Sequence, residues 1–126
     1  MLTMKNRKPK ILIVDDEEAF TRLTRLTLTD YEIREENDSA RALETARDFR
    51  PDLILLDVMM PELDGGDVAA LIQATPELKE TPIVFLTAIV TQKETAARPL
   101  LGGFPFISKP VTPERLAENI EKFLKR

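Results

Sequence analysis

Carboxylates are the main groups available for chemistry in this chain of 126 residues, which contains no cysteine and no histidine. Thiolate zinc sites, imidazole metal ligands, cysteine nucleophiles and histidine bases are therefore excluded. Asp15 and Asp16 follow one short apolar run, Asp57 ends a second, and Thr87 and Lys109 end two later runs. Three carboxylates, a hydroxyl and an ammonium group together are typical of a site for a hard cation and phosphate oxygens.

The negative charges in this set need a counter-charge. Two carboxylates about 4 Å apart repel each other by about 4 kcal/mol at an effective dielectric constant of about 20. Lys109 supplies one positive charge, and a divalent cation would supply the rest. Oxygen ligands without histidine or cysteine favour Mg²⁺ or Mn²⁺ over zinc or copper. Because Mg²⁺ commonly completes its shell with water and phosphate oxygens, phosphoryl chemistry is the leading use of such a site.

Each of these residues also has a purely structural interpretation. Asp15 or Asp16 can cap a helix, and Asp57 can begin a turn. Thr87 can be an ordinary strand residue, and Lys109 can be a solvated surface charge. Their joint placement at the ends of four apolar runs is what favours a common site.

Short apolar runs alternate with helical patterns along the whole chain. The runs expected to form strands are residues 11–14, 31–34, 52–57, 82–87 and 104–108. The stretches expected to form helices are residues 20–28, 40–49, 68–74, 92–98 and 113–124. This alternation predicts an α/β fold, a flavodoxin-like, doubly wound (βα)5 three-layer sandwich with a parallel sheet of strand order 2-1-3-4-5. In that order the carboxyl ends of the strands meet at one edge, so the five polar residues should converge there.

The polarity of two elements is informative. The second strand is more polar than the first, which is typical of an edge strand. One side of the first helix is expected to be buried, the side with Phe20, Leu23, Thr27 and Leu28.

The charge of −4 is unevenly distributed. The first ten residues carry four basic side chains and no acidic one, so the remainder of the chain carries −8. This acidic body argues against direct nucleic-acid binding. No signal peptide and no membrane-spanning segment is predicted, so a cytoplasmic location is expected. We expect residues 1–9 to be a flexible basic leader and residues 10–126 to form one domain.

Four motifs in this order resemble the receiver domain of two-component response regulators, the CheY-like family. The resemblance runs from about residue 10 to residue 124. The motifs are Ile13-Val14-Asp15-Asp16-Glu17, Leu55-Leu56-Asp57-Val58-Met59-Met60-Pro61 with Asp64-Gly65, Phe85-Leu86-Thr87-Ala88, and Phe106-Ile107-Ser108-Lys109-Pro110.

The resemblance implies a role for each site residue. Asp57 would be the phospho-acceptor, forming an acyl phosphate. Mg²⁺, or alternatively Mn²⁺, would be held by Asp16, Asp57 and the backbone carbonyl of Met59, with Asp15 acting through a bound water. Lys109 would contact another oxygen of the phosphoryl group. Such a chain is a signalling domain rather than a metabolic enzyme, and it catalyses only its own phosphorylation and dephosphorylation.

The resemblance also implies a switch and partners. Thr87 and Phe106 would rearrange on phosphorylation, and the Lys109–Pro110 peptide bond would be cis. Because the chain has no histidine, the phosphoryl donor would be a separate sensor histidine kinase or histidine phosphotransfer protein. The output partner is unknown, and a homodimer is left open.

Two stretches depart from the usual pattern of the family. The helix expected at 92–98 is poorly specified by the sequence, because Pro99 would break it and the residues before it do not form a clear helix start. The usual output surface of the family is therefore in doubt. Met59 and Ile89 place apolar groups beside Asp57. Our hypothesis is that they hinder a hydrolytic water, so that the acyl phosphate is long-lived.

Other functions remain as alternatives. In a flavodoxin-type redox carrier the acidic residues 15–18 would repel the phosphate of the flavin. An acid-nucleophile phosphohydrolase usually needs a second aspartate at the position that Met59 occupies. The chain could also be a docking module that is not phosphorylated, or a receiver excised from a longer transcription factor or hybrid kinase.

Overall fold

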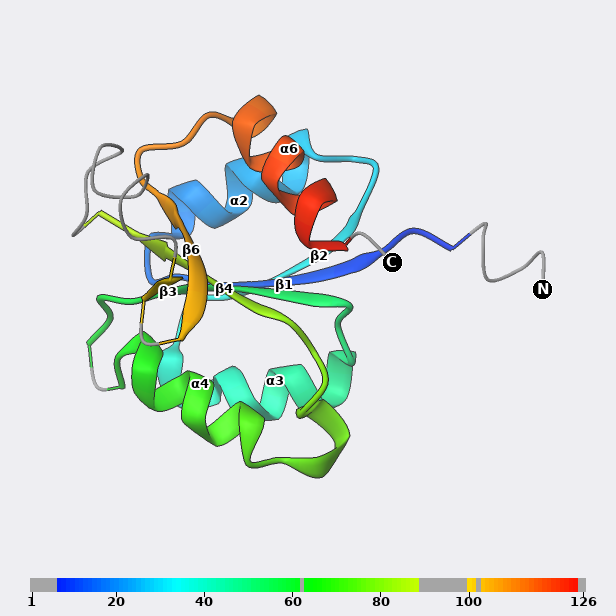
Figure 1. Cartoon of the computed structure of the whole chain (residues 1–126). Coiled ribbons are helices and arrows are strands. Elements are labelled where there is room, and N and C mark those ends of the chain that lie inside the picture. Colours follow the sequence, from blue (N-terminus) through cyan, green and yellow to red (C-terminus); the bar gives the residue numbers. More distant parts are fainter. Residues whose placement is uncertain (1–6, 62, 89–99, 102, 125–126) are drawn as a thin grey trace.

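The chain forms a parallel sheet between two layers of helices (Figure 1). The computed structural model describes residues 7–61, 63–88, 100–101 and 103–124. The parallel strands are β1 (Lys10–Val14), β2 (Glu32–Glu36), β3 (Leu53–Asp57), β4 (Ile83–Thr87) and β6 (Phe104–Ser108). Their order is β2-β1-β3-β4-β6. This confirms the predicted order 2-1-3-4-5, with β6 as the fifth parallel strand.

One further strand was not expected from the sequence. It is β5 (Leu100–Leu101), which pairs antiparallel with β6 at the edge of the sheet. Gly103 has a φ of 90° in the turn between the two strands. Glycine adopts this backbone conformation without a steric penalty.

Among the described residues, two helices cover each face of the sheet. Figure 1 shows α2 (Glu18–Thr27) and α6 (Pro113–Leu124) on one face, and α3 (Ala42–Phe49) and α4 (Gly65–Gln73) on the other. Single turns of 3₁₀ helix, η1 (Ser39–Arg41) and η2 (Pro76–Leu78), precede α3 and follow α4. The helix predicted at 92–98, with Pro99 after it, lies outside the described residues. Within the described part of the chain, no helix combines the length and apolar composition needed to cross a membrane.

Helix α4 begins three residues before the predicted start at residue 68. Asp64 accepts a hydrogen bond from the backbone N–H of Asp67, and the side chain of Asp67 accepts one from the backbone N–H of Asp64. This reciprocal pair satisfies N–H groups that have no partner inside the helix. The helix can therefore start on two glycines.

The predicted buried side of the first helix was wrong in part. Leu23 is 54% exposed and Thr27 is exposed, whereas Thr21 and Thr24 are buried. The two buried hydroxyls are satisfied, because Thr24 donates to the carbonyl oxygen of Phe20 at 2.9 Å and Thr21 donates to Glu35 on β2. Threonine carries a methyl group and a hydroxyl, so it can face the sheet where a polar partner is available.

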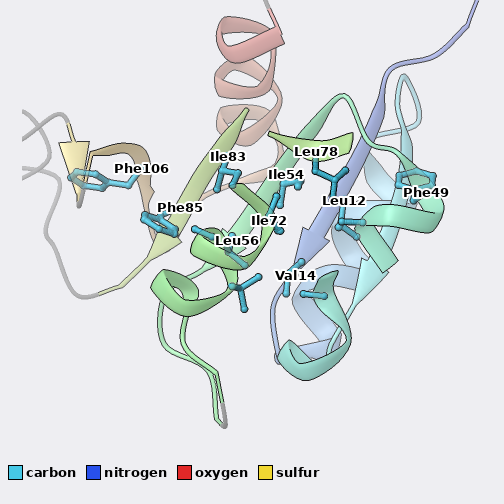
Figure 2. Close-up of a cluster of buried hydrophobic side chains, with 14 residues drawn as sticks. Leu12, Val14, Phe49, Ile54, Leu56, Ile72, Leu78, Ile83, Phe85 and Phe106 are labelled. Atoms are coloured by element: carbon cyan, nitrogen blue, oxygen red, sulfur yellow. The ribbon is translucent and has the colours of Figure 1, made fainter. Parts of the chain in front are cut away.

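The core on the α3 and α4 side positions the strand ends. Leu12 and Val14 of β1 and Ile54 and Leu56 of β3 are fully buried there (Figure 2). Their neighbours along the same strands face α2 and α6. Because both faces of β1 and β3 are buried, these strands hold the residues that follow them in fixed places.

Candidate functional site

The three predicted carboxylates converge at the carboxyl ends of β1 and β3. These strands are neighbours in parallel register, with Val14 paired to Leu56, so Asp15 and Asp57 leave the sheet side by side. Carboxylate oxygens of Asp15, Asp16 and Asp57 all lie within 4.8 Å of one another. Asp15 and Asp57 are buried and Asp16 is exposed. The cluster is thus open to solvent on the Asp16 side.

Lys109 brings a positive charge into this cluster from the end of β6. Its Nζ lies 2.8 Å from Oδ2 of Asp15, 2.9 Å from Oε1 of Glu17 and 3.9 Å from Oδ1 of Asp57. Its backbone N–H donates to the carbonyl oxygen of Thr87 at 2.8 Å, and the peptide bond to Pro110 is cis. Burial alone would lower the pKa of Lys109, but the hydrogen bonds to Asp15 and Glu17 outweigh it and raise that pKa. Lys109 is therefore a cation at neutral pH.

The surroundings of Asp57 disfavour the ionised form of its carboxyl group. Its side chain is 6% exposed. Burial and the negative charge of Asp15 raise its pKa to about 6, against the opposing effects of Lys109 and the Met59 N–H group. That N–H group donates to Oδ1 of Asp57 at 3.4 Å. A further cation that enters the cluster would therefore stabilise the ionised form of the Asp57 carboxylate.

The backbone around Asp57 is tightly packed against the start of α4. The N–H of Gly65 donates to the carbonyl oxygen of Val58 at 2.9 Å. A Cβ atom at position 65 would lie 2.6 Å from the carbonyl oxygen of Asp57 and 2.9 Å from Cα of Val58. Only glycine allows this approach, so Gly65 sets how closely α4 approaches the Asp57 backbone.

Thr87 and Phe106, the two predicted switch residues, lie on the neighbouring strands β4 and β6. Thr87 is fully buried at the end of β4, and the residue before it pairs with Asp57. Phe106 is 6% exposed and belongs to the core cluster, near Phe85 at one end of Figure 2. Ile89 lies outside the described residues, while Met59 is 63% exposed.

Glu17 is a further member of the cluster, and the residue pattern did not predict its contact with Lys109. Its carboxylate shares Lys109 with Asp15, and its own backbone N–H donates to Oδ1 of Asp15 at 3.0 Å. The acidic run 15–18 was a signal for it, but the partner lies 92 residues away in the sequence.

The donor set fits a hard divalent cation. Three carboxylates offer oxygen atoms within 4.8 Å of one another, and one of them is open to solvent. Oxygen ligands of this kind suit Mg²⁺ or Mn²⁺. The single ammonium group of Lys109 faces the carboxylates of Asp15, Glu17 and Asp57, so it leaves part of their negative charge uncompensated.

Comparisons with known proteins show the family to which this chain is similar. The family described as "Response regulator receiver domain" matches residues 11–121. The chain is 37% identical over 125 residues to "Probable transcriptional regulator ycf27" of Pyropia yezoensis, covering 98% of this chain and 50% of that protein. It is 32% identical over 116 residues to "Polar-differentiation response regulator DivK" of Brucella anthropi, covering 90% and 94% respectively. The chain spans about half the length of the ycf27 relatives that it matches.

Solved structures show the same architecture. The chemotaxis protein CheY4 of Vibrio cholerae matches with a TM-score of 0.77 at 29% identity, over 90% of this chain and 97% of that one. A putative response regulator from Chloroflexus aurantiacus matches with a TM-score of 0.80 at 28% identity, over 95% and 100%. Together with the family match over residues 11–121, these likenesses show that the chain belongs to the response regulator receiver domain family.

Proposed function

We propose that Asp57 accepts a phosphoryl group from a phosphohistidine on a separate sensor histidine kinase or histidine phosphotransfer protein. The observation that supports this most directly is the meeting of Asp57 with Asp15, Asp16 and Lys109 at one edge of the sheet. The 126 residues contain no histidine, so a phosphohistidine donor would lie outside them. Membership of the receiver family supports this class of function, and the position of Asp57 beside Asp15, Asp16 and Lys109 supports Asp57 as the acceptor.

The proposed transfer exchanges one bond to phosphorus for another. An oxygen of the ionised Asp57 carboxylate attacks the phosphorus, forming a P–O bond while the P–N bond of the phosphohistidine breaks. The imidazole nitrogen leaves with the electron pair of that bond. Lys109, whose Nζ is 3.9 Å from Oδ1 of Asp57, is placed to contact an oxygen of the transferred group. The residues around Asp57 mainly position the reactants and balance charge.

A divalent cation is part of this proposal. Asp16, Asp57 and the backbone carbonyl of Met59 would hold Mg²⁺ or Mn²⁺, and Asp15 would act through a bound water. When bound, the metal neutralises negative charge on the phosphoryl oxygens. Asp15 keeps Lys109 beside the site through the 2.8 Å contact.

The switch and the output are proposed on the same basis. Thr87 would turn its hydroxyl toward the phosphoryl oxygen, and Phe106 would repack beside it, which links a local charge to a surface change. PhoP of Bacillus subtilis, which is 34% identical, is named as a transcriptional regulatory protein, and this chain covers 49% of it. DivK is covered over 94% of its length. We propose that this domain acts through a protein partner, either alone or within a longer regulator.

The test uses the purified chain with Mg²⁺ and acetyl phosphate as a small-molecule donor. We expect intact-mass measurements to show one added phosphoryl group, and hydroxylamine trapping followed by peptide mapping to locate it at Asp57. Asp57→Asn should abolish the adduct. Asp48→Asn is the matched control, because the Asp48 side chain is 77% exposed and lies outside the cluster. An adduct that survives in Asp57→Asn, or no adduct in the wild-type chain, would contradict the proposal.

A further inference from the structure

Asn37, the residue after β2, connects the acidic loop to α2. Its side-chain amide donates to the backbone carbonyl oxygen of Asp15 at 2.7 Å and to Oγ1 of Thr21 at 2.9 Å. The next residue, Asp38, caps η1, because its Oδ1 accepts from the N–H of Ala40 at 3.0 Å. The Asn37 amide is therefore available to the acidic loop.

A chain of polar contacts holds the Asn37 side chain on the side away from the carboxylate cluster. Thr21 is fully buried, and its hydroxyl donates to Oε1 of Glu35 at 2.9 Å while it accepts from Asn37. Glu35 is paired in turn with Arg25 of α2. Burial alone would raise the pKa of Glu35, but the hydrogen bonds from Arg25 and Thr21 outweigh it and lower that pKa. Glu35 is thus ionised, and it orients the Thr21 hydroxyl so that its oxygen can accept from Asn37.

The contact of Asn37 completes the hydrogen bonding of Asp15. The backbone N–H of Asp15 donates to the carbonyl oxygen of Glu36 at 3.1 Å. Its two carboxylate oxygens accept from the N–H of Glu17 and from Lys109. Its carbonyl oxygen accepts from Asn37. This carbonyl belongs to the planar peptide unit that includes the nitrogen of Asp16, so holding it also sets the direction in which Asp16 continues.

We propose that Asn37 is a positioning residue, which holds the Asp15–Asp16 peptide so that both carboxylates face the cation site. The inference rests on the proposed function, since it concerns how that site is kept ready for Mg²⁺. Groups that orient metal ligands from behind typically change metal affinity by 10–100-fold when they are removed. Mutual repulsion pushes the three carboxylates apart, and a bond to the backbone between two of them opposes that movement.

The test compares Asn37→Ala with Asn119→Ala in the full chain. The side chain of Asn119 donates to the carbonyl oxygen of Arg115 at 2.8 Å within α6, so its removal also breaks one amide hydrogen bond. Calorimetric titration with Mg²⁺ should give a dissociation constant about tenfold higher for Asn37→Ala and unchanged for Asn119→Ala. Before metal is added, the ¹⁵N–¹H signal of the Asp16 amide should move in Asn37→Ala and stay in place in Asn119→Ala. A merely structural role of Asn37 would not single out this amide.

A second variant keeps the inference testable if Asn37→Ala folds poorly. Thr21→Val removes the hydroxyl that supports Asn37 but leaves the Asn37 contact to Asp15, so we expect a smaller rise of the dissociation constant, about threefold, in the same direction. If the wild-type chain binds Mg²⁺ and both variants bind it within twofold of wild type, the inference is overturned and the proposed function stands. If the wild-type chain binds no Mg²⁺, the proposed function fails first and the inference falls with it.

Discussion

The two ends of strand β3 each carry an aspartate in a different setting. Asp52, before the strand, accepts the N–H of Lys10 at 2.7 Å and pairs with Arg7, and its side chain is 34% exposed. Asp57, at the other end, is 6% exposed and lies among other carboxylates. At the first end, solvent, the N–H of Lys10 and the exposed Arg7 side chain stabilise the Asp52 carboxylate. At the second end, the buried Asp57 carboxylate lies among other negative charges that Lys109 compensates only in part. Such an uncompensated buried charge is typical of a reactive site and not of a surface ion pair.

Removing the cation at each end gives the largest predicted contrast. Lys109→Met leaves the buried carboxylates of Asp15 and Asp57 without their ammonium partner, and we expect the free energy of unfolding at pH 7 to fall by about 3 kcal/mol. Arg7→Met removes an exposed partner, since the Arg7 side chain is 44% exposed, and should cost less than about 1 kcal/mol. Urea denaturation without metal measures both. Equal losses would mean that the two ends do not differ.

Removing the carboxylate itself should produce an effect of the opposite sign. The pKa of Asp57 is raised from 3.8 to about 6, so the native state binds its proton more tightly than the unfolded chain does. Stability should therefore fall as the pH rises from about 4 to about 6 and stay low above that range. At 1.36 kcal/mol per pH unit, Asp57→Asn should stabilise the metal-free chain by about 3 kcal/mol at pH 7 and by little at pH 4.

The matched change at the other end is Asp52→Asn. It should weaken the chain slightly, by less than about 1 kcal/mol at pH 7, because the ion pair with Arg7 is lost. Denaturation curves at pH 4 and pH 7 distinguish the two variants. A stabilisation by Asp57→Asn that is the same at both pH values would rule out the ionisation of Asp57 as its cause.

The close packing around Asp57 predicts a strong effect of one methyl group. Gly65→Ala would place a Cβ 2.6 Å from the Asp57 carbonyl oxygen, so backbone must shift, at a cost of about 2 kcal/mol. Gly66→Ala meets only the Asp64 side chain, at 3.3 Å, and should change stability by less than about 1 kcal/mol. Thermal unfolding measures the difference. In Gly65→Ala we also expect slower phosphorylation by acetyl phosphate, because the Asp57 backbone moves.

The smallest predicted effect concerns the lifetime of the phosphorylated form. Met59 is two residues after Asp57, and its side chain is 63% exposed. If its apolar side chain hinders a hydrolytic water, Met59→Asn should speed the loss of phosphate severalfold, which corresponds to about 1 kcal/mol. Leu71→Asn, on α4 and 44% exposed, is the control. Equal decay rates for Met59→Asn and wild type would leave the hypothesis without support.

Much of the fold could be predicted because it follows from local patterns. The apolar runs that became β1 and β3 are buried on both faces, and their directions place Asp15 and Asp57 at the same edge. The buried side of α2 could not be read in this way. Hydrophobic spacing favoured Leu23, but Thr21 faces the sheet because Glu35 and Asn37 offer it partners there.

The sequence by itself determined the order of the elements and the residue types at the strand ends, since these depend on neighbouring residues and on the common direction of parallel strands. Only the tertiary structure decided which groups form ion pairs and hydrogen bonds with one another. Lys109 reaches Asp15 across 94 residues, and Asn37 reaches it across 22. The raised pKa of Asp57 likewise arises from burial and from Asp15, which is distant in the sequence. Electrostatic and hydrogen-bond energies depend on distances in space, and these exist only once the chain has folded.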